Sequence, residues 1–248
     1  MTIHTQTHPI HTLLRRQAKI YNNSNNISRK ISNILFDLDG TLTDPGKGIT
    51  RCVQYALDRL GAAMPLSDAL TWCVGPPLRA SFSKLLNTTD EAVLDQALVY
   101  YRKRFSEKGM FENFLYPGVV SSLGGLRKAG FNLFLATSKP RVFAQQIMDH
   151  FKMTPFFHRI YGSELDGRLS DKGALIAHII HQESLDPPVT MMVGDRVYDI
   201  EGGKENKVMT AAVAYGYGTQ EEIAAANPDV VFESIVDLSK TMLSFRTM

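Results

Sequence analysis

The chain has 248 residues, of which 44% are hydrophobic and 21% charged, so it is an ordinary globular protein with room for one large domain or a domain with a smaller insertion. Its formal net charge is +2, but residues 1–36 hold five basic residues and no acidic one, so the remainder carries −3 and is not expected to bind nucleic acid. No run of eighteen apolar residues and no apolar signal-peptide core occur, so we expect a cytoplasmic protein outside any membrane.

The two cysteines, Cys52 and Cys73, do not form a paired metal-ligand spacing such as Cys-x-x-Cys. This pattern predicts two free thiols in a reducing compartment. Neither a disulfide framework nor a zinc site is expected.

Residues 1–30 are polar and include a run of asparagine and serine at 22–26. Such a segment buries too little apolar surface to order itself, so we predict a disordered N-terminal arm. Its basic residues Arg15, Arg16 and Lys19 could contact an anion or act as a weak targeting signal, but a solvated tail or an over-long gene start fits the composition better.

An apolar strand at 34–36 leads directly into two carboxylates, Asp37 and Asp39, which are followed by Gly40 and Thr41. Ligands of open α/β sheets bind at the carboxyl ends of strands, and Gly40 allows the chain to turn sharply there. Two like charges buried together need a cation to offset them. The stretch therefore indicates a metal site, although a simple Asp-Gly turn would show the same local pattern.

Helical patterns fill residues 46–116. Apolar residues recur at helical spacing over 49–60 and again over 93–105, the second run after a capping-box pattern from Thr88 to Glu91. A loop with two prolines at 75–79 leads into a further helix between them. We expect the helical character to continue to about residue 113.

Pro and Gly residues at 45–48 and 116–118 indicate a flexible hinge on each side of this helical segment. We therefore predict a small helical cap domain over 46–116, inserted into a core domain formed by residues 31–45 and 117–248. A cap tied by two short links can open and close.

Helix and strand patterns alternate after residue 118, as in βαβ units. The predicted strands are 131–136, 157–161, 189–193, 208–213 and 229–232, with helices at 119–129, 140–151 and about 172–182 and an acidic turn after the third of these strands. Because the strands are apolar enough to be buried on both faces, we predict a doubly wound, Rossmann-like parallel α/β sheet.

Polar side chains follow several of these strands. Strand 131–136 ends in Thr137 and Ser138, whose hydroxyls and following helix amides can hold a phosphate, although a helix N-cap is the simpler interpretation of either residue alone. Strand 189–193 ends in a loop that carries two further carboxylates, and Lys172 opens the helix between these strands. The sequence thus predicts one polar edge of the sheet.

Together, Asp37 to Thr41, Thr137, Lys172 and the stretch from Gly194 through Asp195 to Asp199 resemble the four motifs of the haloacid dehalogenase superfamily of phosphohydrolases. The resemblance covers residues 33 to about 233, and the insertion after the first motif is similar to the family's helical type 1 cap, as in phosphoglycolate phosphatases.

The resemblance implies a role for each matching residue. Asp37 corresponds to the nucleophile, Asp39 to the general acid and base, Thr137 and Lys172 to the phosphate-binding pair, and Asp195 to a Mg²⁺ ligand. We expect Mg²⁺ to be held by Asp37, Asp39, Asp195 and Asp199, with Asp199 directly or in support, and the substrate to be contacted by Thr41, Ser138 and Arg79.

The chemistry of phosphate esters agrees with these residue types. Mg²⁺ and a lysine spread the charge of the transferring phosphoryl group, an aspartate forms a covalent phosphoenzyme, and a second carboxylate moves the protons. We therefore expect a phosphatase that acts on a small phosphorylated metabolite, as a monomer or homodimer. Phosphoglycolate is the leading substrate, and a nucleoside 5′-monophosphate is the alternative.

Other activities fit less well. Dehalogenases similar to this chain lack an acid at the position of Asp39, hexose phosphate mutases of this cap type usually carry histidine where Ile49 stands, and neither Lys47 nor Lys84 has neighbours that suggest a Schiff-base lysine. A dinucleotide-binding protein would need further glycines after Gly40. A catalytically silent phosphate-binding regulator on the same fold stays open.

The loop at 75–79 ends in Arg79 at the start of a predicted cap helix. We expect cap closure to bring Arg79 over the catalytic edge, where it would contact a second polar group of the substrate or stack on a base. A solvated surface arginine is the alternative.

Overall fold

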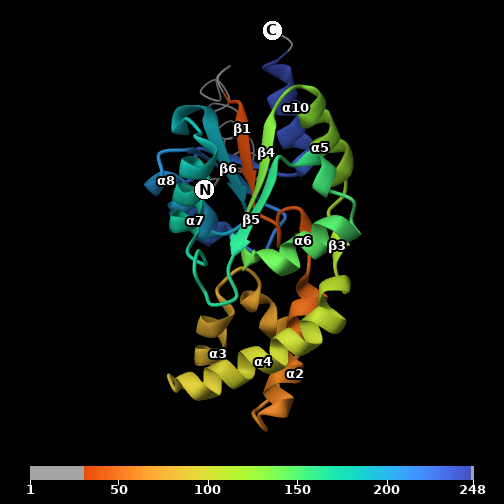
Figure 1. The fold of residues 1–248 in the computed structure, drawn as a ribbon, viewed down its shortest axis with the longest axis vertical. Helices are drawn as coiled ribbons and strands as arrows, with labels where there is room; N and C mark the ends of the chain where they lie inside the picture. The colour runs from red at the N-terminus through yellow and green to blue at the C-terminus, as the bar shows by residue number, and fades with distance from the viewer. Residues whose placement is uncertain (1–30, 247–248) are drawn as a thin grey trace, which may run out of the picture.

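The computed structural model describes residues 31–246, and its centre is a six-stranded parallel sheet with the strand order β5-β4-β1-β6-β7-β8 (Figure 1). The strands are β1 (Asn33–Phe36), β4 (Asn132–Pro140), β5 (Arg159–Ser163), β6 (Thr190–Gly194), β7 (Met209–Val213) and β8 (Val230–Phe232). The predicted doubly wound α/β fold is confirmed. The first strand lies between β4 and β6, so the chain leaves it toward both halves of the sheet, and ligands bind at such switch points.

Helices cover both faces of this sheet. They are α5 (Val119–Lys128), α6 (Arg141–His150), α7 (Lys172–Glu183), α8 (Val197–Glu205), α9 (Gln220–Ala226) and α10 (Ile235–Ser244). In β1, Ile34 and Phe36 share one hydrophobic cluster with residues of α5, α6 and α10, whereas Leu35 packs with α7 on the other face. This alternation is what a strand that is buried on both sides requires.

Three core helices, α8, α9 and α10, were not predicted, and α8 occupies the place of the predicted acidic turn. Two glycines within α8 weaken its helical pattern. Both are needed for packing, because a Cβ at Gly202 would lie 2.8 Å from the Gly173 nitrogen of α7, and one at Gly203 would lie 2.6 Å from the side chain of Thr210 in β7. The glycines therefore let α8 approach its neighbours closely.

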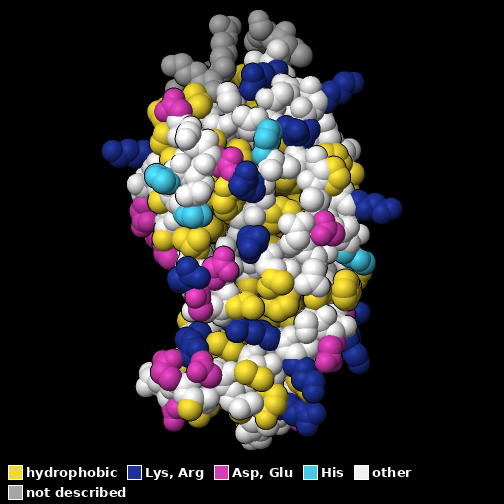
Figure 2. Space-filling view, viewed as in Figure 1, with side chains coloured by type: hydrophobic (Ala, Val, Ile, Leu, Met, Phe, Trp, Pro, Cys, Tyr) yellow, Lys and Arg dark blue, Asp and Glu magenta, His cyan; other side chains and the backbone are white. Residues whose placement is uncertain are grey.

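The cap helices are α2 (Gly46–Arg59), α3 (Leu78–Leu86) and α4 (Glu91–Glu107); a 3-10 segment at Ser67–Cys73 lies between α2 and α3, and another at Gly109–Phe111 follows α4. They fall within the stretch that the sequence predicts to be a cap, and Figure 1 shows them gathered below the sheet. The two links to the sheet run side by side, since β2 (Thr43–Asp44) pairs in antiparallel fashion with β3 (Phe114–Leu115). Figure 2 shows hydrophobic side chains gathered across the junction of sheet and cap helices on this face.

Local details of the cap differ from the prediction. The expected hinge at 45–48 is largely the first turn of α2, and Gly48 is a packing residue, because a side chain there would clash with the carbonyl of Gly109. The N-cap of α4 is Asp90, whose carboxylate accepts hydrogen bonds from the amides of Ala92 and Val93, so the predicted capping box at Thr88 is wrong. An aspartate directly before the helix competes successfully for this position.

None of the helices in residues 31–246 combines the length and the apolar character needed to cross a membrane. The predicted N-terminal arm, residues 1–30, lies outside the described residues.

Candidate active site

The carboxyl ends of β1, β4 and β6 bring the predicted site residues together. Asp37 follows β1, and its amide donates a hydrogen bond of 2.9 Å to the carbonyl of Val193 in β6. Thr137 lies within β4, and Asp195 follows β6 directly. All three of these polar side chains are buried. The register of the parallel sheet therefore places them at one edge, as the strand pattern predicts.

Lys172 reaches this edge from the first residue of α7. Its Nζ lies 2.9 Å from Asp37 Oδ1, 2.8 Å from Asp199 Oδ1 and 2.9 Å from the carbonyl oxygen of Ala136, to which it donates. Burial would lower the pKa of this amine, but the carboxylates of Asp199 and Asp37 outweigh burial and raise it. The side chain is therefore a buried, charged ammonium group that donates hydrogen bonds to Asp37 and Ala136 and forms an ion pair with Asp199.

Three buried carboxylates, Asp37, Asp195 and Asp199, each offer one oxygen within 4.8 Å of the others. Burial, together with the charges of Asp199 and Asp37, raises the pKa of Asp195 well above its ordinary value. Burial also raises the pKa of Asp199 to about 6, although Lys172 opposes the shift. A divalent cation would offset this repulsion, and a set of carboxylate oxygens is the donor type that Mg²⁺ prefers. The three residues therefore fit a Mg²⁺ site.

Asp195 is held in place by groups from two other segments. Thr41 Oγ1 donates to its Oδ1 at 3.0 Å, and the amide of Tyr217 donates to its Oδ2 at 2.8 Å. Gly40, at a φ of +85°, passes so close that any side chain there would clash with the carboxylate. Thr41, predicted to contact the substrate, is fully buried, donates its hydroxyl proton to Asp195 and is not among the residues that line the cavity.

The Asp39 carboxylate lies outside the group of three carboxylates, so the structure does not support its predicted share in binding the metal through the side chain. Its Oδ2 forms an ion pair with Lys139 Nζ at 2.6 Å, while its buried Oδ1 has no hydrogen-bond partner among residues 31–246. Burial raises the pKa of this carboxyl, and Lys139 opposes the shift. A raised pKa and a free oxygen suit a group that must carry a proton.

Lys139 was not predicted as a site residue, although it directly follows the Thr137-Ser138 pair. Its Nζ also lies 4.5 Å from the ring centre of Phe105 in the cap helix α4. A cation over an aromatic face is attracted to it. Lys139 therefore joins the cap to the edge of the sheet that carries Asp37, Asp39, Thr137 and Asp195, called the catalytic edge below.

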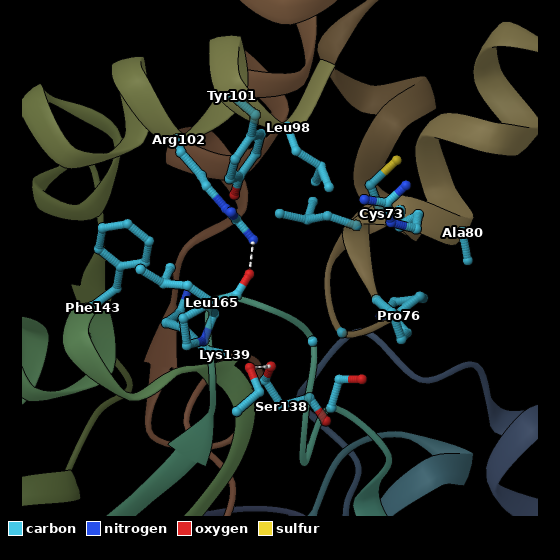
Figure 3. Close-up of a pocket in the computed structure, with 18 of the residues that line it drawn as sticks. Cys73, Pro76, Ala80, Leu98, Tyr101, Arg102, Ser138, Lys139, Phe143 and Leu165 are labelled. Carbon is cyan, nitrogen blue, oxygen red and sulfur yellow. Dashed lines mark hydrogen bonds between the residues drawn. The ribbon is translucent and has the colours of Figure 1, made fainter. Parts of the chain in front are cut away.

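A cavity of about 1050 Å³ lies between this edge and the cap helices. Asp37, Asp39, Thr137, Ser138 and Lys172 line it from the core side. Figure 3 shows Leu98, Tyr101 and Arg102 of α4 above it, Cys73, Pro76 and Ala80 to one side, and Ser138 below. The predicted phosphate-binding and substrate-binding residues Thr137 and Ser138 are thus in reach of a bound molecule.

Arg79 also lines this cavity, but its guanidinium pairs with Glu91 and Asp95 of the neighbouring helix α4. These two carboxylates neutralise it within the cap, so the structure does not support the predicted contact with the substrate. A different cap arginine, Arg102, reaches into the cavity and donates from Nη2 to the carbonyl of Leu165 at 2.8 Å.

Arg196 is a second residue that the sequence pattern did not single out. It forms an ion pair of 2.8 Å with Glu222 and donates to the carbonyl of Val74, in the loop that precedes α3. Gly75 follows at a φ of +103°, and a Cβ there would lie 2.9 Å from the Arg196 guanidinium. The core thus holds the loop at 74–77 against the mouth of the site.

Comparison with known proteins places the chain in a family. The family model described as haloacid dehalogenase-like hydrolase matches residues 34–213. The chain is similar to a 5′-nucleotidase of Pseudomonas aeruginosa, with 45% identity over 79% of this chain and 88% of that protein. It is also similar to the tyrosine-protein kinase PtkA of Mycobacterium tuberculosis, with 36% identity over 80% and 67% of the two chains. A phosphoglycolate phosphatase of Pseudomonas syringae shares 30% identity over 82% and 76%.

A solved structure agrees with these relatives. The crystal structure of a predicted phosphatase from Clostridium acetobutylicum has a TM-score of 0.82 and 41% identity, and the match covers 86% of this chain and 99% of that one. The family model covers most of the residues that the structure describes, including all four predicted motifs. The chain therefore belongs to the haloacid dehalogenase-like hydrolase family and is a phosphatase of that type.

Proposed function

We propose that this protein is a Mg²⁺-dependent phosphomonoesterase that forms an aspartyl-phosphate and acts on nucleoside 5′-monophosphates. The observation that carries the proposal is the buried grouping of Asp37 with Lys172, Asp195 and Asp199, of which Asp37, Lys172 and Asp199 line the cavity. A nucleophilic carboxylate, a fixed cation and a set of oxygen ligands are the parts that phosphoryl transfer needs.

In the first half-reaction, a carboxylate oxygen of Asp37 attacks the phosphorus atom, and the bond from phosphorus to the leaving oxygen breaks. Asp39, with its raised pKa, donates its proton to that oxygen, so the alcohol leaves in neutral form. Lys172 remains at hydrogen-bond distance from Asp37 and offsets the negative charge of the phosphoryl group.

In the second half-reaction, Asp39 is a carboxylate and takes a proton from water while the water oxygen attacks phosphorus. The bond from phosphorus to Asp37 breaks, which releases inorganic phosphate and restores both carboxyl groups. Thr137, whose hydroxyl oxygen accepts a hydrogen bond from the Lys139 amide at 3.3 Å, is placed to donate its proton to a phosphate oxygen.

Asp37, Asp195 and Asp199 are the residues that would hold Mg²⁺. The ion would supply positive charge to the phosphoryl oxygens as they approach Asp37. The residues around it have the matching task of fixing the carboxylates, and Thr41 and Tyr217 do this for Asp195.

Two observations favour nucleoside monophosphates over phosphoglycolate. The nucleotidase relative is more similar to this chain than the phosphoglycolate phosphatase, at 45% against 30% identity. The cavity is also large, about 1050 Å³, and its cap side carries apolar residues such as Leu94, Leu98 and Val99. A nucleoside would occupy such a space, whereas glycolate would leave most of it unused.

An assay for inorganic phosphate tests the proposal. Nucleoside 5′-monophosphates, 2-phosphoglycolate and acetyl phosphate are compared with Mg²⁺, with excess chelator and with Ca²⁺. We expect the highest kcat/KM for a nucleoside monophosphate, loss of activity in chelator, and inhibition by Ca²⁺, whose looser coordination would misplace Asp37.

Full activity in chelator would refute the metal dependence, and a clear preference for 2-phosphoglycolate would refute the substrate. Transfer of phosphate from a labelled donor to protein tyrosine, without release of inorganic phosphate, would refute hydrolysis.

A further inference from the structure

Five basic side chains line the cavity, and four of them face carboxylates. Lys172 pairs with Asp37 and Asp199, Lys139 with Asp39, Arg196 with Glu222, and Arg79 with Glu91 and Asp95. The fifth, Arg102, has no carboxylate within ion-pair distance in the described part of the chain. Its positive charge is therefore the one on this lining that the protein leaves to be balanced by solvent or by a ligand.

The Arg102 side chain is half-buried and extends from α4 into the cavity (Figure 3). One of its five N–H donors is used, by the carbonyl of Leu165 at 2.8 Å. This single bond fixes the direction of the guanidinium group without neutralising it. The remaining donors and the flat face of the group are available to a bound molecule.

Two exposed apolar side chains accompany this cation on the same lining. Val99, one helical turn before Arg102, is 57% exposed, and Leu165, in the loop after β5, is 48% exposed. Exposed apolar residues are ordinary when they are scattered, but here the hydrogen bond from Arg102 places Leu165 beside the guanidinium, and Val99 lies one helical turn away on the same helix. A group that is apolar on its faces and polar at its edge matches this surface, and a nucleobase has this character.

The position of Arg102 relative to the reacting atoms also fits contact with a part of the substrate distant from its phosphate. Lys139, which pairs with Asp39, lies under the ring of Phe105 in α4, and Phe105 stacks on Tyr101 with ring centres 5.5 Å apart. Arg102 follows Tyr101, about one helical turn of 5 Å from Phe105. Arg102 therefore lines the cavity from the cap side, whereas Asp37 and Asp39 line it from the core side, and a leaving group must extend across the cavity to contact Arg102.

We infer that Arg102, flanked by Val99 and Leu165, is the binding site for the nucleobase of the substrate, an inference that rests on the proposed function. The guanidinium donates hydrogen bonds to acceptor atoms at the edge of the base, and the two apolar side chains cover its face. Arg102 thus takes the role that the sequence pattern suggests for Arg79, because Arg79 is neutralised by its neighbours and Arg102 is not.

The test compares kcat/KM for a nucleotide with kcat/KM for a small phosphorylated compound, as a ratio of the two values. For wild type and variants, kcat/KM is measured with uridine 5′-monophosphate and with acetyl phosphate, whose leaving group is too short to reach α4. We expect Arg102→Ala and Arg102→Met to lower the ratio about tenfold, mainly through KM, because the lost contact is to a part of the substrate that does not react. Arg102→Met keeps the long apolar stem and so controls for lost packing.

Lys103→Ala is the matched control, since Lys103 is the next residue of α4, is exposed and does not line the cavity. It removes the same charge and should leave the ratio within about twofold. Inhibition by the product uridine is a second readout, and Arg102→Met should weaken it about tenfold.

An unchanged ratio in both Arg102 variants, or an equal loss with both substrates, would overturn the inference while the proposed function stands. A wild-type protein that hydrolyses acetyl phosphate but no nucleoside monophosphate would instead overturn the proposed function, and the nucleobase site with it. Failure of the inference is seen in the Arg102 variants, whereas failure of the proposed function is seen in the wild-type protein, so the two can be distinguished.

Discussion

The two sides of the cavity hold their charges in different ways. At the catalytic edge, Lys172 pairs with Asp37, 135 residues away in the chain, and both groups are buried. On the cap side, Arg79 pairs with residues 12 and 16 positions away, and all three partners are exposed. Breaking a buried ion pair strands a charge and is costly, whereas an exposed pair contributes little. Substitutions at the charged residues of the edge are therefore expected to be costly, whereas substitutions at the exposed charges of the cap side should leave the fold intact.

The largest expected effect is at the centre of the catalytic edge. Asp37→Asn should lower kcat by on the order of 10⁴ or more, because an amide is not a competent nucleophile and no phosphoenzyme can form. Acid-quenched wild-type protein should carry labelled phosphate on Asp37, and the variant should carry none. Appreciable turnover by Asp37→Asn would show that the buried side of the cavity tolerates substitution as readily as the cap side.

Metal binding should link the buried carboxylates to pH. Burial raises the pKa of Asp199 to about 6. Below that pH the carboxyl is protonated and protons compete with Mg²⁺ for it, whereas above that pH the carboxylate is free to bind the ion. Stabilisation by Mg²⁺ should therefore be fully present at pH 7.5 and decline as the pH falls through 6. At a Mg²⁺ concentration about a hundredfold above its dissociation constant, we expect Tm to rise on the order of 5–10 °C at pH 7.5 and clearly less at pH 5.5.

Thermal unfolding at constant ionic strength measures this difference, with Na⁺ in place of Mg²⁺ as the control. An equal rise in Tm at both pH values would exclude these carboxylates as the metal ligands.

Lys139 lies where the two regions meet, since it contacts Asp39 of the edge and Phe105 of the cap. Lys139 holds the pKa of Asp39 down against the effect of burial, so Lys139→Met should raise that pKa further. The base form of Asp39 then becomes scarcer, and kcat should fall about tenfold at neutral pH. The acid limb of the pH profile of kcat should move to higher pH.

Lys103→Met, at an exposed lysine of α4, is the control for the loss of a positive charge. If Lys139→Met lowered kcat but left the pH profile in place, Lys139 would act by another route than the proton affinity of Asp39.

The smallest effect is expected on the cap side, at Arg79. Because its ion pairs with Glu91 and Asp95 are exposed, Arg79→Ala should change the free energy of unfolding by less than about 1 kcal/mol. Its kcat/KM should stay within about twofold of wild type for both nucleotide and acetyl phosphate. A selective tenfold loss with the nucleotide would restore Arg79 to the substrate site and weaken the case for Arg102.

Local sequence patterns were enough to predict the sheet and most of the catalytic edge. Each core strand is a short apolar run, and the carboxyl end of a parallel strand is the same end for all of them, so Asp37, Thr137 and Asp195 had to meet. Helix α8 was not predicted because its two glycines weaken the helical pattern. Their role is to allow close packing against α7 and β7, which is seen only in the tertiary structure.

The partners of the charged side chains depended on the tertiary structure. Both Thr41 and Asp39 belong to the motif at the end of β1, yet Thr41 donates a hydrogen bond to Asp195 whereas Asp39 forms an ion pair with Lys139. Likewise, Arg79 and Arg102 are both cap arginines, and nothing in their local sequence tells which one meets carboxylates from α4 and which one enters the cavity. Strand and helix formation depends on neighbours along the chain, whereas the state of a charge depends on the groups that packing brings within a few ångströms.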